Sequence, residues 1–463
     1  MSLPHILRSV ACLVLMALTC VQQCLFAEEL TLDEARQFAA PLVEAERVDG
    51  LSVGVTQGNK QWSFHLGKAT PDGKSPDDQT LYEIGSLSKV FTALLLATSV
   101  VDKTVDLNEA AAGGPSETPL PRFSEQSIRW IDLVTHRSGL PRLPDNFGDP
   151  SHSDPYADYD SQRARAFLSK HELRRKPGDG FEYSNFAYAW LGHLVAQRAD
   201  SDYETLLAQR VTGPLNMKDT VVSLSEDQQA RMAVGNTSFG NPGNRWEFAD
   251  LPGAGAIRST IADMQEFVAA SLHPPEAKIG EAIELAWRQH HPGDGSNFAM
   301  GLGWMIARDG QTRFHNGQTG GFHAAMFVNR SLDSAIVVLA NTAEATLVDQ
   351  IAERLIQRTA GMKVLPPSLD REIKVDAEQM QRLVGRYQLT PELIFDVQVQ
   401  DNRLMVELTN QPRFQVYAKT PILWFYKVVD AQLEFELESS GPAKAIILHQ
   451  FGLKQKATRL NDK

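Results

Sequence analysis

Ser86 and Lys89 stand three residues apart in the segment Gly85-Ser-Leu-Ser-Lys, where an apolar stretch with helical spacing begins. On a helix, residues three apart lie on one face, so the hydroxyl and the amine can meet. In a partly apolar environment the pKa of a lysine falls from ~10.4 towards neutrality, and the amine can then accept the serine proton. The start of a helix also stabilises negative charge that develops near the serine. The pattern therefore predicts a nucleophilic serine, although a capping serine beside a solvated lysine would show the same spacing.

A second group of candidate residues is Tyr183-Ser-Asn185, the one Tyr-x-Asn triplet of the chain, which precedes an apolar helical segment at 186–196. A phenol, with an ordinary pKa of ~10, can be held ionised beside a lysine ammonium or can relay a proton. The amide of Asn185 can bind a substrate carbonyl and orient the lysine. A simpler interpretation stays open, in which Tyr183 is a packed aromatic residue and Asn185 is the N-cap of the helix.

The third candidate is His315-Asn-Gly317. A Lys or His two residues before a Gly occurs five times, but only His315 lies between two strand-like runs late in the chain. The segment continues as Gln318-Thr-Gly-Gly-Phe. An Asn-Gly pair between strands is also a strong hairpin-turn signal. Both interpretations hold together if the turn places His315 beside the serine.

The elements that must position these residues are strands near both ends of this region and helices between them. Thr31 and Glu34 form a capping box for one helix, and Thr260 caps another. Helical spacing continues over 84–101, and 102–263 is mostly helix and loop. Strand-like patterns occupy residues 51–56, 61–66, 298–307, 312–315, 322–329 and 334–340, before a closing helix near 346–358. This order predicts an α/β (α+β) fold, with one antiparallel sheet flanked by helices and a helical subdomain.

The C-terminal part has a different pattern. Residues 362–375 contain Pro366-Pro367 and mixed charges, as a linker does. Beyond them, apolar residues alternate at period two in several short runs between 395 and 437, separated by turn residues. Residues 376–463 are therefore expected to form a small all-β domain, an antiparallel sheet or barrel.

In this order, the three motifs resemble those of the active-site serine family of penicillin-binding D-Ala-D-Ala carboxypeptidases and class C β-lactamases, over roughly residues 30–360. Four flanking segments look similar as well, at residues 133–141, 213–217, 253–255 and 301–304. The tail resembles the lipocalin-like barrel appended to some D-aminopeptidases. The resemblance implies a serine hydrolase domain over residues 28–361 that uses no metal ion and no organic cofactor.

The same resemblance implies a role for each motif. Ser86 would be the acylated nucleophile, Lys89 its activating partner, and Tyr183 the general base and acid. Substrate would be bound by Asn185, His315, Gly317 and Gln318. The backbone N–H groups of Ser86 and Gln318 would form the oxyanion hole.

One residue departs from the β-lactamase pattern, because the chain has His315-Asn-Gly where those enzymes have Lys-Thr-Gly. A histidine is mostly neutral at pH 7 and anchors a substrate carboxylate less reliably than a lysine. We therefore expect a D-Ala-D-Ala carboxypeptidase or a related D-amino-acid amidase, acting through an acyl-enzyme on peptidoglycan-type peptides. The alternatives are a β-lactamase or small-ester esterase of the same family, and a non-catalytic protein that binds peptidoglycan or β-lactams.

The first 27 residues have the pattern of a secretory signal peptide. His5 and Arg8 precede an apolar run at 10–18, and cleavage would follow Ala27. The run is too short to span a membrane, so we expect a secreted or periplasmic protein with no stable span after cleavage; an uncleaved membrane anchor is the alternative. All three cysteines lie at or before residue 24, so the mature chain would contain no disulfide. The net charge of −12 and the lack of a large basic cluster argue against nucleic acid as a partner.

Overall fold

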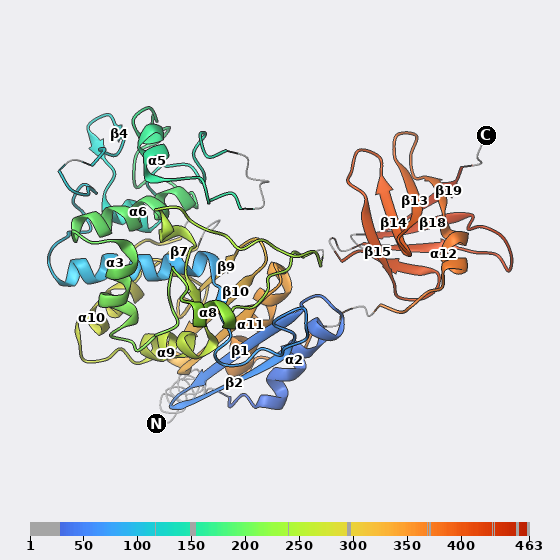
Figure 1. Ribbon diagram of the computed structural model, residues 1–463, viewed down its shortest axis with the longest axis horizontal. Helices are drawn as coiled ribbons and strands as arrows, with labels where there is room; N and C mark the ends of the chain where they lie inside the picture. Colours follow the sequence, from blue (N-terminus) through green and yellow to red (C-terminus); the bar gives the residue numbers. More distant parts are fainter. Residues whose placement is uncertain are drawn as a thin grey trace, which may run out of the picture.

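The computed structural model describes residues 28–460, apart from residues 116, 149–153, 239, 294–297, 368, 370–371, 428, 430 and 451–452. The predicted signal peptide, residues 1–27, lies outside the described residues. The chain forms an N-terminal α/β part and a C-terminal β-barrel (Figure 1). No helix within the described ranges combines the length and the apolar character needed to cross a bilayer.

A seven-stranded antiparallel sheet forms the centre of the α/β part. Its order, β2-β1-β11-β10-β9-β8-β7, places β1 between β2 and the last strand, β11, so that Val53 pairs with both Phe64 and Val338. The predicted sheet of distant chain segments is therefore confirmed. The strands are β1 (Gly50–Gln57), β2 (Lys60–Gly67), β7 (Ala299–Met300), β8 (Met305–Ile306), β9 (Thr312–Gln318), β10 (His323–Asn329) and β11 (Ser334–Ala340).

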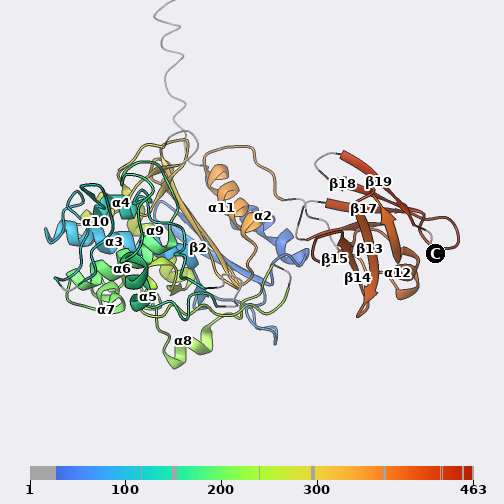
Figure 2. The ribbon, with the colours of Figure 1, turned by 90° about the horizontal axis from the view of Figure 1, so that it is seen from above.

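Helices cover both faces of this sheet (Figure 2). Helices α2 (Leu32–Glu44) and α11 (Ala345–Thr359) pack on one face, and α9 (Ile261–Leu272) packs on the other. Consequently, successive side chains of β11 enter different cores, Val337 on the α9 side and Val338 on the α2 and α11 side. The predicted caps are confirmed, since Thr31 accepts from the N–H of Glu34 and Thr260 from the N–H of Asp263.

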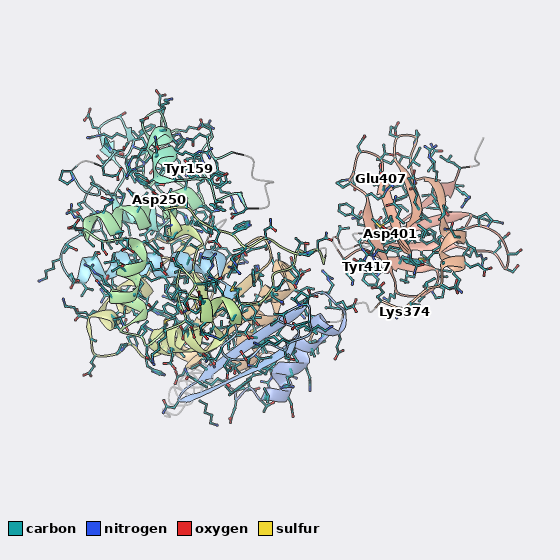
Figure 3. The ribbon with its side chains drawn as sticks, in the orientation of Figure 1. Tyr159, Asp250, Lys374, Asp401, Glu407 and Tyr417 are labelled. Carbon is teal, nitrogen blue, oxygen red and sulfur yellow. The ribbon has the colours of Figure 1, made fainter. Side chains whose placement is uncertain are left out.

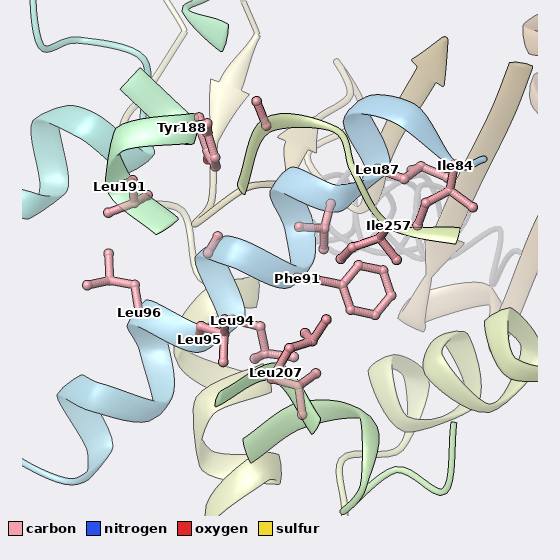
Figure 4. Close-up of a cluster of buried hydrophobic side chains, with 14 of the residues drawn as sticks. Ile84, Leu87, Phe91, Leu94, Leu95, Leu96, Tyr188, Leu191, Leu207 and Ile257 are labelled. Atoms are coloured by element: carbon pink, nitrogen blue, oxygen red, sulfur yellow. The ribbon is translucent and has the colours of Figure 1, made fainter. Parts of the chain in front are cut away.

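The predicted helical subdomain is also present, and its central helix is α3 (Ser88–Val101). This helix is buried over nearly its whole length, and Phe91, Leu94 and Leu95 point into the surrounding apolar cluster (Figure 4). Such burial explains the mostly apolar sequence of α3, whose polar residues Lys89 and Thr92 are buried as well. The other helices here are α4 (Trp130–Val134), α5 (Ser161–Leu168), α6 (Asn185–Arg198), α7 (Tyr203–Leu207), α8 (Glu226–Arg231) and α10 (Lys278–Trp287), with the short turns η2 (Ala208–Thr212) and η3 (Pro252–Ala254). A further turn, η4 (Arg330–Leu332), connects β10 to β11 in the sheet.

Two short antiparallel strand pairs and one carboxylate tie the loops of this subdomain together. β3 (Tyr82–Glu83) pairs with β6 (Arg258–Ser259), and β4 (Arg122–Phe123) pairs with β5 (Gln126–Ser127). Asp250, which lies near Tyr159 in Figure 3, accepts hydrogen bonds from the backbone and hydroxyl of Ser161 at the start of α5. The loop before η3 is thereby fixed to the N-terminus of α5.

The C-terminal part is a closed eight-stranded antiparallel barrel preceded by α12 (Ala377–Leu383). Alternate residues of its strands, such as Phe395 and Val397, fill the interior, as the period-two pattern predicts. Arg47 of the α/β part donates hydrogen bonds to Glu344 and to the carbonyl oxygen of Lys427 in the barrel. The strands are β12 (Gly385–Gln388), β13 (Ile394–Gln400), β14 (Arg403–Leu408), β15 (Phe414–Ala418), β16 (Leu423–Phe425), β17 (Ala431–Glu436), β18 (Ala445–Gln450) and β19 (Leu453–Arg459).

Two details of the sequence-based prediction are wrong. Residues 298–307 form two short strands, β7 and β8, because Gly303 has φ of +74° and turns the chain between them. The Asn316-Gly317 pair is not a hairpin turn, because β9 continues through it to Gln318 and the chain turns afterwards, at 319–322. Gly317 is needed in this strand because the backbone of residues 84–87 approaches it too closely for a Cβ.

Candidate active site

Ser86 lies in a 3₁₀ turn, η1 (Gly85–Leu87), directly before α3 and against strand β9. Gly85 has φ of +50°, and a Cβ at this residue would lie 2.6 Å from the backbone nitrogen of Gln318. A Cβ at Gly317 would lie 2.6 Å from the backbone nitrogen of Ser86. Glycine at both positions lets the turn and the strand meet backbone to backbone. The amides of Ser86 and Gln318, the two predicted oxyanion donors, therefore lie close together at the nucleophile.

Lys89 lies one helical turn after Ser86 and is fully buried, with 0 % of its surface exposed. Its Nζ donates to Ser86 Oγ at 2.9 Å and to the carbonyl oxygen of Ala254 at 2.7 Å. No ion pair to Lys89 occurs among the described residues. Burial, reinforced by the positive charge of Arg142, lowers the pKa of Lys89 well below its usual value. The amine is thus poised to accept the serine proton.

Tyr183 precedes α6, whose N-cap is Ser184 and not Asn185, because the Ser184 hydroxyl accepts from the N–H of Ala187. Its ring stacks on that of His136, with centroids 4.4 Å apart, and the Nζ of Lys89 lies 5.0 Å from the ring centroid. Burial raises the pKa of Tyr183 to about 12, although Ser86 and Arg142 act in the opposite direction. The phenol is therefore protonated at neutral pH, and the suggestion that it is held ionised is wrong for this structure.

Asn185 lies at the start of α6 and lines the same cavity as Ser86. Its Nδ2 donates to the hydroxyl of Tyr156 at 2.8 Å, and its buried Oδ1 has no hydrogen-bond partner in the described structure. Asn185 does not orient the lysine, since the carbonyl of Ala254 does so. The open Oδ1 can accept a hydrogen bond from a substrate N–H, in contrast to the predicted contact of the amide with a substrate carbonyl.

His315 lies in β9 with 1 % of its surface exposed, and its ring centroid is 6.3 Å from that of Tyr183. Burial and the nearby charge of Lys89 lower the pKa of His315 to about 3, so the imidazole is neutral at pH 7. His315 does not line the cavity, in contrast to its strand neighbours Asn316 and Gln318. The expected contact between His315 and a substrate carboxylate is therefore not supported, because a buried neutral ring supplies neither the charge nor the access.

A cavity of about 610 Å³ opens in front of Ser86. The backbone of β9, at Gly317 and Gln318, lines one part of it, together with His323 of β10. Aromatic rings and one guanidinium form much of the remaining wall. These residues are Arg142, Phe147, Tyr156, Tyr183, Trp246 and Phe248. The cavity can therefore take an acyl group that packs against rings while its carbonyl carbon faces Ser86.

Two residues of the site, His136 and Arg142, were not singled out from the sequence. His136 has φ of +58°, accepts from the N–H of Ser184 through Nδ1, and supports the ring of Tyr183. The guanidinium carbon of Arg142 lies 5.3 Å from the centroid of the same ring. Both residues belong to or adjoin the flanking segment 133–141. That segment is the signal that could have pointed to them.

The sheet, the buried helix and the Ser86–Lys89 contact define a serine hydrolase. A family model described as Beta-lactamase matches residues 35–361 of the chain. The protein therefore belongs to the β-lactamase family, which includes class C-like enzymes and D-Ala-D-Ala carboxypeptidase homologues.

Three similar proteins illustrate the relationship. The chain is 26 % identical over 331 residues, 67 % of this chain and 84 % of the relative, to D-alanyl-D-alanine-carboxypeptidase/endopeptidase AmpH of Escherichia coli (strain K12). It is 24 % identical to penicillin-binding protein 4* of Bacillus subtilis (strain 168), over 93 % of this chain and 96 % of the relative. The solved structure of a β-lactamase/D-alanine carboxypeptidase from Yersinia pestis matches with a TM-score of 0.62 at 22 % identity, covering 71 % of this chain and 97 % of that structure.

Proposed function

We propose that the protein is an exported D-Ala-D-Ala carboxypeptidase, or a related D-amino-acid amidase, that works through an acyl-enzyme on Ser86. The observation that carries the proposal is the buried Lys89 amine, which lies 2.9 Å from Ser86 Oγ beside the protonated phenol of Tyr183 and has no ion pair in the described structure. Two relatives similar in sequence are named as a D-alanyl-D-alanine-carboxypeptidase/endopeptidase and as a penicillin-binding protein, which supports this substrate class.

In the acylation step, the neutral amine of Lys89 accepts the proton of Ser86 while Oγ forms a bond to the substrate carbonyl carbon. The negative charge that develops on the carbonyl oxygen is stabilised by the N–H groups of Ser86 and Gln318. A substrate that fills the cavity excludes water from Ser86, and these donors then act in a medium of lower dielectric constant, where they are stronger than in water. Lys89 thus performs the base role that the resemblance gives to Tyr183.

Collapse of the tetrahedral intermediate breaks the bond between the carbonyl carbon and the leaving nitrogen. The phenol of Tyr183 donates its proton to that nitrogen, and the ammonium of Lys89, beside the same ring, restores the phenol proton. A water molecule then attacks the acyl ester, its proton passes through the same groups, and Ser86 leaves as the hydroxyl. Tyr183 acts here as the general acid.

The mechanism is tested by incubating the protein with a penicillin and measuring its intact mass. We expect an adduct of one penicillin that maps to the peptide containing Ser86, because a β-lactam presents a strained amide to the same nucleophile. The Ser86→Ala variant should form no adduct and should release no D-alanine from a D-Ala-D-Ala peptide. Ser169→Ala, an exposed serine after α5, is the matched control and should behave as the wild type. Full activity of Ser86→Ala would refute the assignment.

The lifetime of the adduct separates the proposed function from its alternatives. A long-lived adduct supports the carboxypeptidase, and rapid release of the hydrolysed penicillin indicates a β-lactamase. Turnover of small esters without release of D-alanine would indicate an esterase. An adduct without turnover of any of these substrates would indicate a binding protein. Export is tested separately, by determining the N-terminal residue of the protein secreted or recovered from the periplasm, which we expect to be Glu28.

A further inference from the structure

The cavity in front of Ser86 has one permanently charged side chain in its lining, that of Arg142. No aspartate or glutamate lines the cavity within the described part of the chain. The one histidine of the lining, His323, hydrogen-bonds the carboxylate of Asp349 at 2.7 Å. Lys89 and His315 do not line the cavity, and burial lowers the pKa of Lys89 well below its usual value and that of His315 to about 3. Among the described side chains of the lining, Arg142 is therefore the basic group without an acidic partner, and an anionic group of a substrate that enters the cavity meets it.

The backbone of Arg142 is fixed to the start of α6. Its carbonyl oxygen accepts from the N–H groups of Asn185 and Phe186, and the preceding carbonyl, of Pro141, accepts from the hydroxyl of Ser184. The side chain then lies over the ring of Tyr183, with the guanidinium carbon 5.3 Å from the centroid. Arg142 thus has a defined position relative to the phenol that protonates the leaving group.

The guanidinium has no hydrogen bond and no ion pair within the described structure. Other arginines of this part of the chain do have such partners: Arg129 pairs with Asp132, and Arg163 donates to the carbonyl oxygens of Asn146 and Asp158. Arg142 is solvent-exposed, so its N–H donors are accessible from the cavity. An arginine with open donors at a substrate cavity is suited to binding a carboxylate through two parallel hydrogen bonds.

We propose that Arg142 binds the carboxylate of the leaving D-amino acid and thereby selects substrates that end in a free carboxylate. The inference rests on the proposed function, since it takes the leaving group to lie beside Tyr183. In an amino acid the carboxylate is two bonds from the nitrogen that accepts the Tyr183 proton. A cation stacked over the ring of that tyrosine can therefore reach the carboxylate while the nitrogen is protonated. Arg142 would take the role that the sequence suggested for His315.

The test uses two thioesters that differ only in the charge of the leaving group: benzoylglycyl thioglycolic acid and its methyl ester. We expect wild-type protein to prefer the acid, measured as the ratio of the two kcat/KM values. In Arg142→Gln this ratio should fall by roughly tenfold to a hundredfold, the range for one charge-assisted contact, mainly through the KM of the acid. Arg142→Lys should retain part of the preference. Arg122→Gln, an exposed arginine in β4, controls for the loss of one charge.

An equal loss on both thioesters would overturn the proposal. Arg142 would then act only through the effect of its charge on the pKa values of Lys89 and Tyr183, which would change the rates of both substrates equally.

A second measurement keeps the inference separate from the proposed function. Binding of N-acetyl-D-Ala-D-Ala and of its C-terminal amide is measured by calorimetry on Ser86→Ala protein, with and without Arg142→Gln. A Kd for the acid that rises tenfold or more in the double variant, with an unchanged Kd for the amide, supports the carboxylate contact even where no turnover occurs. Equal Kd values in the two proteins would overturn it.

Discussion

Replacing Gly317 with alanine tests how the nucleophile is positioned. A Cβ at this residue would lie 2.0 Å from the carbonyl oxygen of Ile84, 2.6 Å from the nitrogen of Ser86 and 2.9 Å from that of Leu87. Ordinary contacts of a Cβ begin at 3.4 Å. All three contacting atoms belong to backbone, so no flexible side chain can move aside. Because the carbonyl oxygen of Ile84 would lie at 2.0 Å and an ordinary contact begins at 3.4 Å, the turn η1 and strand β9 must separate by more than 1 Å.

This separation acts on both oxyanion donors, because Ser86 lies in the turn and Gln318 follows Gly317 in the strand. A misplacement of about 1 Å can cost ~10²-fold in rate, and loss of one oxyanion donor costs roughly 10²–10³-fold. Overpacking costs about 1–3 kcal/mol of stability. We therefore expect Gly317→Ala to slow acylation by penicillin by roughly 10²–10³-fold and to lower the Tm by several degrees.

The assay combines the rate of adduct formation by intact mass with the Tm from calorimetry. Gly114→Ala is the matched control, because its Cβ would lie 3.9 Å from the nearest atom, and it should leave both values unchanged. A Gly317→Ala protein that is acylated at the wild-type rate would refute the view that the backbone contact with β9 positions Ser86.

Three further predictions concern the acid, the buried histidine and the barrel. Tyr183→Phe should slow release of D-alanine by ~10²–10⁴-fold and hydrolysis of a 4-nitrophenyl ester much less, because nitrophenolate leaves without a proton; equal losses would contradict the acid role. The pKa of His315 is about 3 in the folded protein and 6.5 in the unfolded chain, so protonation of this residue favours the unfolded chain. Its contribution to the free energy of unfolding is therefore complete above pH 6.5 and is lost as the pH falls towards 3. Between pH 7 and pH 5 this residue accounts for a loss of about 2 kcal/mol in the free energy of unfolding. The Tm of His315→Gln should therefore fall less over this range than the Tm of the wild type, and parallel Tm curves for the two proteins would contradict the expectation. A protein that ends at Lys363 should fold and retain acylation of Ser86, because α11, the last helix that packs on the sheet, ends at Thr359. A molten product would show that the α/β part needs the barrel in order to fold.

Regular elements of the fold could be predicted because their patterns are local. The capping residues Thr31 and Thr260 act within one turn, and the period-two strands of the barrel show which face is buried. Ser86 and Lys89 could be paired for the same reason, since helical spacing alone brings them together. In each case the interaction lies within a few residues of the chain.

The remaining features depend on contacts between distant segments. Asn316-Gly317 looks like a turn locally, but the glycine is required because η1, more than 200 residues earlier, approaches the strand. The protonation of Tyr183 and His315 likewise depends on burial by other segments. Arg142 carries no motif, and its position over Tyr183 follows from the packing of its loop on α6. Sequence spacing contains none of this information.

The charge states around Ser86 explain why a lysine can be the base. Burial lowers the pKa values of Lys89, His136 and His315 and raises that of Tyr183, so each of these groups is driven towards its neutral form. Proton transfer from Ser86 to Lys89 then creates a cation and an oxyanion together, in a medium where their attraction is strong. A histidine or tyrosine that was already charged would oppose or divert that transfer. The neutral His315 is therefore consistent with a site in which a cation for the substrate carboxylate, Arg142, stands at the cavity wall and not beside the lysine.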